Sequence, residues 1–145
     1  MEVKVDSSQI VMLEGFFNEL SAIDQRKIFL AGFRKASKPL IAAAKAGSPY
    51  DTGTLRKSIG SIALPQEIAI LVGARKSGAN KGWHGHLVEN GTKDRFRKSG
   101  ARTGKVMGTH FFELAYNATQ DEVYSAIEQE WYNEIDRFII KVNNK

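Results

Sequence analysis

The sequence predicts an α+β fold with N-terminal helices, a small antiparallel β-sheet that carries a long basic loop, and a long C-terminal helix. Apolar residues recur at three- and four-residue intervals in both terminal thirds, and two short β-rich runs follow each other in the middle. With 145 residues, 42% of them hydrophobic, the chain can build one modest core. We expect a single domain over 1–145, with a helical region at 1–47, a β-hairpin and Gly/Arg-rich loops at 48–108, and the C-terminal helix at 109–142.

The N-terminal third predicts two helices. The apolar residues of the first lie at helical spacing and are Leu13, Phe16, Phe17 and Leu20. Ser21 to Asp24 is typical of a cap that opens a second helix, which we expect to run to about Ala46, where Gly47 offers a stop. The apolar stripe of this second helix is formed by Phe29, Phe33, Ala36, Leu40 and Ala43.

Two residues inside the second helix oppose a regular helix. Pro39 predicts a kink, because proline lacks an N–H and its ring clashes with the preceding turn. Gly32 should weaken the helix by about 1 kcal/mol relative to alanine, a cost that tertiary packing can offset.

A β-hairpin is predicted in the middle of the chain. Residues 58–64 and 67–72 are short β-rich runs separated by a Pro-Gln turn signal. The second run alternates Ile68, Ile70 and Val72 with other residues, which indicates one buried face. Eight glycines follow between positions 73 and 108, so we expect exposed loops there around a short ordered piece near the Val-Glu-Asn-Gly-Thr run.

The last third predicts one long helix. Its periodic positions are Phe112, Ala115, Thr119, Val123, Ile127, Trp131, Ile135, Phe138 and Val142. Thr119 and Glu122 match a capping box, so a break two residues before Thr119 is left open. Trp131, Tyr132 and Phe138 exceed what one narrow core stripe needs, which indicates that part of this helix forms an interface.

The composition excludes several classes of protein. Zero cysteines rule out disulfides, thiol catalysis and thiolate zinc sites. No stretch approaches the roughly 18 to 20 consecutive apolar residues that span a bilayer, and the first residues lack the apolar core of a signal peptide. We therefore expect a soluble protein that is made in a cytoplasm and has no membrane partner.

The net charge of +5 is concentrated in residues 93–105. The basic residues of this segment are Lys93, Arg95, Arg97, Lys98, Arg102 and Lys105, against the single acid Asp94. The rest of the chain holds 15 basic and 15 acidic residues, since 21 minus 6 and 16 minus 1 both give 15. The basic character is therefore local, and the absence of any helical or strand period in the segment predicts an exposed loop.

Two functions fit this basic loop equally well. It can neutralise phosphates without reading base sequence, with Phe96 stacked on a base and an affinity that falls steeply with salt. Alternatively it is a solvated loop that becomes ordered only against an acidic neighbouring subunit. The sequence leaves both open.

A rigid corner is predicted at residues 48–59, after the second helix. Pro49 keeps the preceding residue extended, Asp51 or Thr52 can accept backbone N–H groups, and Gly53 permits a close approach. We expect one helical turn to begin directly after this corner.

Within that turn, Leu55 and Ile59 are four residues apart and should point inward. Arg56 and Lys57 should then point outward, with no nucleophile and base beside them. Taken by themselves, the residues of this segment favour a helix cap followed by surface charges.

The run from Val88 to Thr92 contains an Asn-Gly turn former preceded by an apolar anchor. A lone carboxylate beside a turn, such as Glu89, is usually a cap or an ion-pair partner, and Arg56 is the candidate for the pair. A role of Glu89 as a general base is much less favoured.

Three histidines, His84, His86 and His110, combine with Glu89 into a candidate metal site of a hydrolase. Their spacing does not favour it. On a strand His84 and His86 share a face that excludes Glu89, and on a helix the two histidines diverge by about 200°. We expect no catalytic residue, no metal ligand and no cofactor.

The two motifs together resemble the signature of a tail-component family of tailed bacteriophages, encoded between the head-completion and tail-tube genes. That signature is a Pro-x-Asp-Thr-Gly-x-Leu-Arg-x-Ser-Ile run followed by a Val-Glu-x-Gly-Thr run. The matching residues are Asp51, Thr52, Gly53, Leu55, Arg56, Ser58, Glu89, Gly91 and Thr92. The segment 109–115 is similar to the family's last element but lacks its two prolines.

The resemblance implies a non-catalytic subunit of a homo-oligomeric ring at the head–tail interface, as a neck, tail-completion or tail-terminator component of the virion. Its implied partners are the neighbouring head-completion or connector proteins and the tail-tube protein, with a possible non-specific contact to genomic DNA. The alternative is a free, non-catalytic nucleic-acid-binding protein that uses the loop 93–105.

Overall fold

The structure is a computed structural model. It describes residues 11, 14, 15, 18, 20–77, 79 and 81–144. The apolar spacing at Leu13, Phe16 and Phe17 lies outside the described residues, so the expected first helix stays a prediction.

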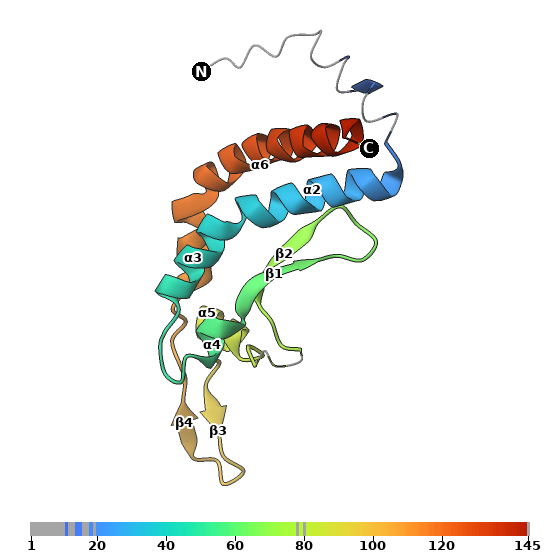
Figure 1. Cartoon of the computed structure of the whole chain (residues 1–145). Coiled ribbons are helices and arrows are strands. Elements are labelled where there is room, and N and C mark those ends of the chain that lie inside the picture. Colours follow the sequence, from blue (N-terminus) through green and yellow to red (C-terminus); the bar gives the residue numbers. More distant parts are fainter. Residues whose placement is uncertain are drawn as a thin grey trace.

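The described part of the chain is α+β, as the sequence predicts (Figure 1). Its elements are α2 (Ala22–Ala36), α3 (Lys38–Gly47), α4 (Thr54–Ser58), β1 (Ile59–Ala63), β2 (Ile70–Ala74), α5 (Gly85–Asn90), β3 (Arg95–Phe96), β4 (Arg102–Gly104) and α6 (Phe111–Asn143). The strands form two separate antiparallel pairs, β1–β2 and β3–β4. Among the helices described, none is both long and apolar enough to cross a bilayer.

Helix α2 begins at the predicted cap. The Ser21 hydroxyl accepts the N–H of Asp24 and donates to the Asp24 carboxylate at 2.8 Å. This hydrogen bond, together with the nearby Lys27 ammonium, holds the pKa of Asp24 below its ordinary value. A short polar side chain thus fixes the first turn of the helix.

The prediction of one kinked helix to Ala46 is wrong, because the chain forms two helices. Helix α2 ends at Ala36, and Pro39 lies in the first turn of α3, where its missing N–H needs no partner. Between them Ser37 is buried, and its hydroxyl donates to Arg34 O at 3.0 Å. The predicted end of the region is confirmed within a residue, since α3 ends at Gly47.

Helix α6 is one continuous helix of 33 residues, so the break considered near Asn117 is absent. Thr119 is buried within the helix, and its hydroxyl donates to Ala115 O at 2.8 Å instead of capping a new helix. Figure 1 shows that the first part of α6 lies beside α3 and the later part beside α2.

The contact between α2 and α6 explains the glycine inside α2. A Cβ atom at Gly32 would overlap the indole of Trp131, so only glycine lets the two helices approach this closely. Phe29 and Phe33 meet the same indole edge-on, with ring centroids 5.0 and 5.3 Å away. Packing therefore offsets the helix-propensity cost that the sequence predicts for Gly32.

The predicted hairpin is present, but its second strand begins later than expected. Strand β2 starts at Ile70, and Ser61 pairs with Val72 in the register. Residues 64–69 form the turn, which is closed by a hydrogen bond from Leu64 N to Ala69 O. Ile68 therefore lies in the turn, 46% exposed, and not on a buried strand face.

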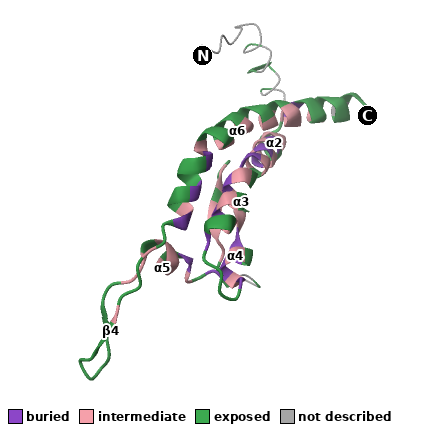
Figure 2. Ribbon diagram, turned by 90° about the vertical axis from the view of Figure 1, so that its left-hand side faces the viewer, coloured by how far each residue is buried: buried purple, intermediate pink, exposed green. Residues whose placement is uncertain are grey.

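The main core lies where α3, α4, β1 and α6 meet. Its buried members are Leu40, Ala44, Leu55, Ile59, Phe111 and Ala115. Figure 2 shows the buried residues on the inner sides of these helices, whereas the outer side of α6 is largely exposed. Burial of Leu55 and Ile59 confirms the inward direction predicted for both. The core ties the corner after α3 to the start of α6.

Candidate functional site

The two motifs meet in one place, which we call the motif joint and define as residues 48–59, 82–92 and 108–115. Gly82 and Gly85 make this contact possible. A Cβ atom at Gly85 would lie 2.8 Å from the Ala74 side chain and 3.2 Å from that of Leu55, and one at Gly82 would overlap the Ser58 hydroxyl. The joint therefore depends on close approach of backbone to side chains, which the glycines allow.

The corner opens as the sequence predicts. Gly53 has a φ of +75° and precedes α4, and the Thr52 hydroxyl accepts the N–H of Thr54 at 3.4 Å. Pro49 and Asp51 are exposed. Glycine is the residue that adopts this left-handed conformation at least cost, so it fixes where α4 begins.

Arg56 is partly buried and binds inside the corner, so the prediction that it points outward is wrong. Its Nη2 donates to Ser48 O at 2.9 Å, and its guanidinium lies 5.3 Å from the ring centroid of Tyr50. Ser48 is 2% exposed and its hydroxyl donates to Lys45 O at 2.8 Å, so Arg56 is anchored to the end of α3. Lys57 is exposed, as expected.

Ser58 connects the corner to the hairpin. Its hydroxyl donates to Leu55 O at 2.7 Å, and its carbonyl accepts both the backbone N–H of Arg75 at 3.0 Å and the Arg75 Nε at 3.2 Å. Ser58 is only 1% exposed. No local signal in the sequence predicts the role of Arg75, because Ser58 and Arg75 are 17 residues apart.

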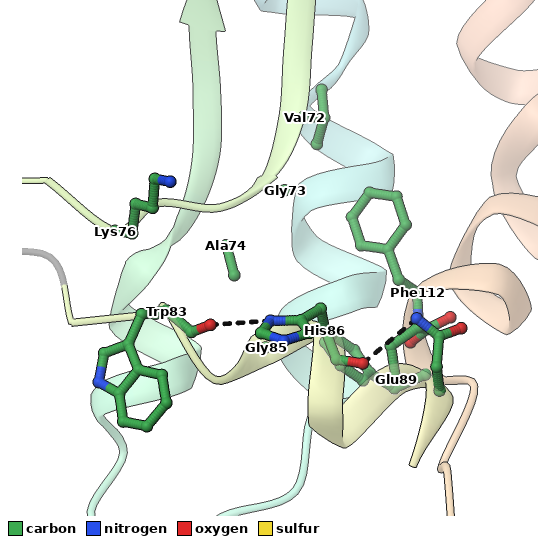
Figure 3. A pocket seen from close by; sticks show the side chains of 12 residues that line it. Val72, Gly73, Ala74, Lys76, Trp83, Gly85, His86, Glu89 and Phe112 are labelled. Atoms are coloured by element: carbon green, nitrogen blue, oxygen red, sulfur yellow. Dashed lines mark hydrogen bonds between the residues drawn. The ribbon is translucent and has the colours of Figure 1, made fainter. Parts of the chain in front are cut away.

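Glu89 caps helix α6. Its two carboxylate oxygens accept the N–H groups of Phe112 at 2.8 Å and Glu113 at 3.0 Å (Figure 3 draws the bond to Phe112). An anion here also interacts favourably with the positive end of the helix dipole. The interpretation of Glu89 as a cap is confirmed, whereas the ion pair with Arg56 is wrong.

The Asn-Gly pair ends a helix and does not form an isolated turn. Asn90 is the last residue of α5, and Gly91 follows with a φ of +78°. A Cβ atom at Gly91 would lie 2.6 Å from Gly108 N and Val106 O. Thr92 continues the contact, because its hydroxyl accepts the N–H of Val106 at 2.9 Å. Both ends of the basic segment are thereby brought side by side.

One group of metal-ligand types lies at the same place. Glu89, His110 and Glu113 each offer an atom within 4.8 Å of the others. Neither His84 nor His86 belongs to this group, in the part of the chain that the structure describes. Both Glu89 oxygens already accept N–H groups at a helix N-terminus, where a cation is disfavoured, so helix capping accounts for the carboxylate.

Beside the joint, β2 and α5 border an open cavity of about 380 Å³ (Figure 3). Its lining includes Val72, Lys76, Trp83, His86 and Phe112. His86 is oriented by a 2.9 Å hydrogen bond between its Nδ1 and Trp83 O. The lining mixes apolar, basic and amide groups with the Glu89 carboxylate, which is already bound to α6.

The basic segment is exposed as predicted, but it forms a short β-ribbon, so the prediction of an unpaired loop is wrong. Strands β3 and β4 pair with an irregular register and turn through Gly100, whose φ is +81°. The Thr103 hydroxyl donates to Arg95 O at 2.8 Å, which fastens one strand to the other. Figures 1 and 2 show the ribbon projecting from the body, and Phe96 is 64% exposed.

The fold and the motif joint together define a class: a small α+β chain whose motif side chains hold backbone segments in place and whose basic ribbon projects from the body. The particular family follows from a comparison with family models. The chain belongs to the HK97-gp10-like family, described as "Bacteriophage HK97-gp10, putative tail-component", whose model matches residues 13–91, more than half of the chain. No curated protein and no solved structure matches the chain.

Family membership confirms the resemblance found in the two motifs. The protein is a structural component of the bacteriophage tail, and so a part of the virion whose partners are other virion proteins. The matched region includes the corner, the hairpin and α5, and it ends at Gly91. The basic ribbon and α6 lie beyond it.

Proposed function

We propose that this tail component is a non-catalytic subunit of a homo-oligomeric ring at the head–tail interface, in the neck, at tail completion or at the tail terminus. One observation carries the proposal: the motif residues are used to build a rigid joint. The side chains of Glu89 and Arg56 hydrogen-bond to backbone atoms of another segment, and the Ser58 carbonyl accepts the backbone N–H and the Nε of Arg75. Such a joint supplies a stable body, not a reaction centre.

A ring needs more than a rigid body. Heterologous contacts close a ring only when each subunit presents two different surfaces to its neighbours. The chain offers two, the projecting ribbon and the exposed outer side of α6 (Figure 2). The residues that we assign to an interface or DNA-facing role are Lys93, Arg95, Phe96, Arg97, Lys98, Arg102 and Lys105.

We further propose that the chain acts as one domain, with the head-completion or connector proteins and the tail-tube protein as partners. The shared core supports this division, since Leu40, Leu55, Ile59 and Phe111 come from all three regions of the chain. A shared core means that the corner and α6 form one body, from which the ribbon projects.

Electron microscopy of lysates from a phage with this gene disrupted tests the proposal. We expect full heads and separate tails, which join or are stabilised when the purified protein is added back. Tail length then separates a terminator, whose loss gives tails of irregular length, from a neck component, whose loss does not. Intact infectious particles without the protein would contradict the proposal.

A second candidate is a non-catalytic nucleic-acid-binding protein, favoured by the exposed cations and the exposed Phe96 of the ribbon. It predicts binding of the isolated protein to bare duplex DNA, with an affinity that falls steeply between 50 and 200 mM salt, roughly a thousandfold for six phosphate contacts. Binding that is absent at low salt would exclude this candidate.

A further inference from the structure

We propose that the basic ribbon of one subunit docks on a stripe of acidic and tyrosine side chains on helix α6 of a second copy of this chain. The inference rests on the proposed ring and names the two surfaces that would close it. We call the stripe the acidic stripe and define it as Asp121, Tyr124, Glu128, Tyr132 and Asp136.

The acidic stripe lies on one side of α6. Its members are separated by three, four, four and four residues, so at about 100° per residue they stay within about 120° of one another. All five are exposed, with Tyr124 at 60% and Tyr132 at 45%. Its last four members each follow by one residue a position of the predicted apolar stripe, among them Trp131, which packs on α2, so the acidic stripe lies about 100° round the helix from that contact.

The carboxylates of the acidic stripe are unused in the single chain. The acids of α6 that form ion pairs are Glu130 and Glu134 with Lys35, Glu134 also with Arg137, and Glu113 with His110. Among the ion pairs of the described residues, none involves Asp121, Glu128 or Asp136. Three carboxylates therefore remain available to a partner.

The ribbon has the complementary chemistry. Its residues 93–105 carry +5, whereas the residues of α6 hold seven acids and two bases, a balance of −5. Within the ribbon only Arg102 pairs with an acid, Asp94, at 2.8 Å, among the ion pairs that the structure describes. Arg95, Arg97 and Lys98 are exposed and free to pair with carboxylates or to stack on tyrosine rings.

The two surfaces also agree in size. The acidic stripe spans 16 residues of helix, about 22 Å from the first to the last. Each arm of the ribbon, from residue 93 or 105 to the turn, is about six residues long and extends about 20 Å. A ribbon lying along the helix would bring its cations over the carboxylates and Phe96 over a tyrosine.

The contact has to be between subunits. Figure 1 shows the ribbon at one end of the molecule and the half of α6 that carries most of the acidic stripe beside α2, toward the other end. A ribbon and a stripe that differ in structure make a head-to-tail contact, which is the kind that closes a ring.

Charge exchange tests this inference in the phage with the disrupted gene. The ribbon variant is R95E/R97E/K98E, the stripe variant is D121K/E128K/D136K, and the third variant combines both. Because like charges brought together cost several kcal/mol, we expect each single-surface variant to lower the number of joined particles roughly a hundredfold or more. The combined variant should recover to within about tenfold of the unchanged protein, because attraction is restored with the charges exchanged.

The matched control is K38E/K57E/K81E, which reverses three exposed cations outside the ribbon and should leave joining unchanged. Circular dichroism checks that every variant folds. Loss in the ribbon variant without recovery in the combined variant would overturn the inference and assign the ribbon to DNA or another virion protein. Failure of the unchanged protein to restore joining would instead contradict the proposed function.

A covalent test does not depend on joining. The chain has no cysteine, so R97C/E128C introduces the only two thiols. In particles that contain this variant, mild oxidation should give a ladder of disulfide-linked multimers, and neither R97C nor E128C alone should extend beyond a dimer. If this variant gives no ladder, the ribbon cysteine is moved from residue 97 to residue 95 or 98. Absence of a ladder from all three variants, each incorporated into particles, would overturn the contact.

Discussion

The motif joint and the basic ribbon are adjacent in the chain and both rich in glycine and charged residues, yet they use them in opposite ways. In the joint, the side chains of Glu89 and Arg56 hydrogen-bond to backbone atoms of other segments, and the buried Ser58 hydroxyl donates to Leu55 O. In the ribbon, most cations are exposed without a carboxylate partner among the described ion pairs. Changes in the joint should therefore alter folding stability, whereas changes in the ribbon should alter what the folded protein binds.

The largest difference is expected between two glycines with nearly the same positive φ. Gly91 has a φ of +78° and its added Cβ would meet backbone atoms at 2.6 Å, whereas Gly100 has a φ of +81° and open space around it. We expect Gly91→Ala to lower the free energy of unfolding by about 3 kcal/mol or more, through strain and overpacking. Gly100→Ala should cost about 1 kcal/mol, from backbone strain alone.

Urea unfolding followed by circular dichroism measures both glycine variants. Equal losses in the two would show that the joint is no more tightly packed than the ribbon.

A smaller difference is expected between two carboxylates. Glu89→Ala leaves the N–H groups of Phe112 and Glu113 without their acceptor, so we expect a loss of about 1 to 2 kcal/mol in unfolding free energy. Asp94→Ala removes an exposed ion pair with Arg102 and should cost less than about 1 kcal/mol.

Hydrogen exchange at the first turn of α6 distinguishes the cap from a general effect. Glu89→Ala should speed exchange at Phe112 and Glu113 more than at the middle of the helix. Unchanged protection at these two amides would contradict the capping role.

Local signals predicted the parts of the fold that neighbouring residues decide. The Ser21 cap, the corner at Gly53 and the inward Leu55 all depend on contacts within a few residues, and each is confirmed. Pro39 predicts a disturbance of the helix, but whether it kinks one helix or begins a second one depends on packing. Burial of Ser37 decides for two helices.

The sequence could not predict contacts that close over long distances along the chain. Glu89 reaches α6 across 23 residues, and Arg75 reaches Ser58 across 17. The ribbon has no alternating pattern, because both of its faces are exposed and no core selects a side. The sequence assigns Trp131, Tyr132 and Phe138 to an interface; this is wrong for Trp131, which packs on α2, whereas Tyr132 is 45% exposed. Helical periodicity alone does not say which side meets α2.

Two hydroxyls give the next comparison. Ser58 is buried and its hydroxyl donates to Leu55 O, whereas the exposed Thr103 hydroxyl donates to Arg95 O in the ribbon. We expect Ser58→Ala to lower the free energy of unfolding by about 1 kcal/mol. Thr103→Val, which keeps the side-chain shape, should leave global stability within about 0.5 kcal/mol. A stability loss in the Thr103 variant as large as that of Ser58→Ala would mean that the ribbon is part of the cooperative unit.

The smallest effect is expected at the exposed cap of α2, formed by Ser21 and Asp24, which compares with the partly buried cap at Glu89. The Ser21 hydroxyl holds the pKa of Asp24 below its ordinary value, so the folded state favours the ionised carboxylate. Its contribution is therefore complete at neutral pH, above the unfolded-state pKa of about 3.9, and is lost as the pH falls through the lower folded-state pKa. In Ser21→Ala the titration of Asp24, followed by NMR of its carboxyl carbon, should shift upward toward the ordinary value. An unchanged titration would show that the charge of Lys27, and not the Ser21 hydroxyl, lowers the pKa of Asp24. The cap of α2 would then differ from the cap at Glu89 in acting through charge and not through a hydrogen bond.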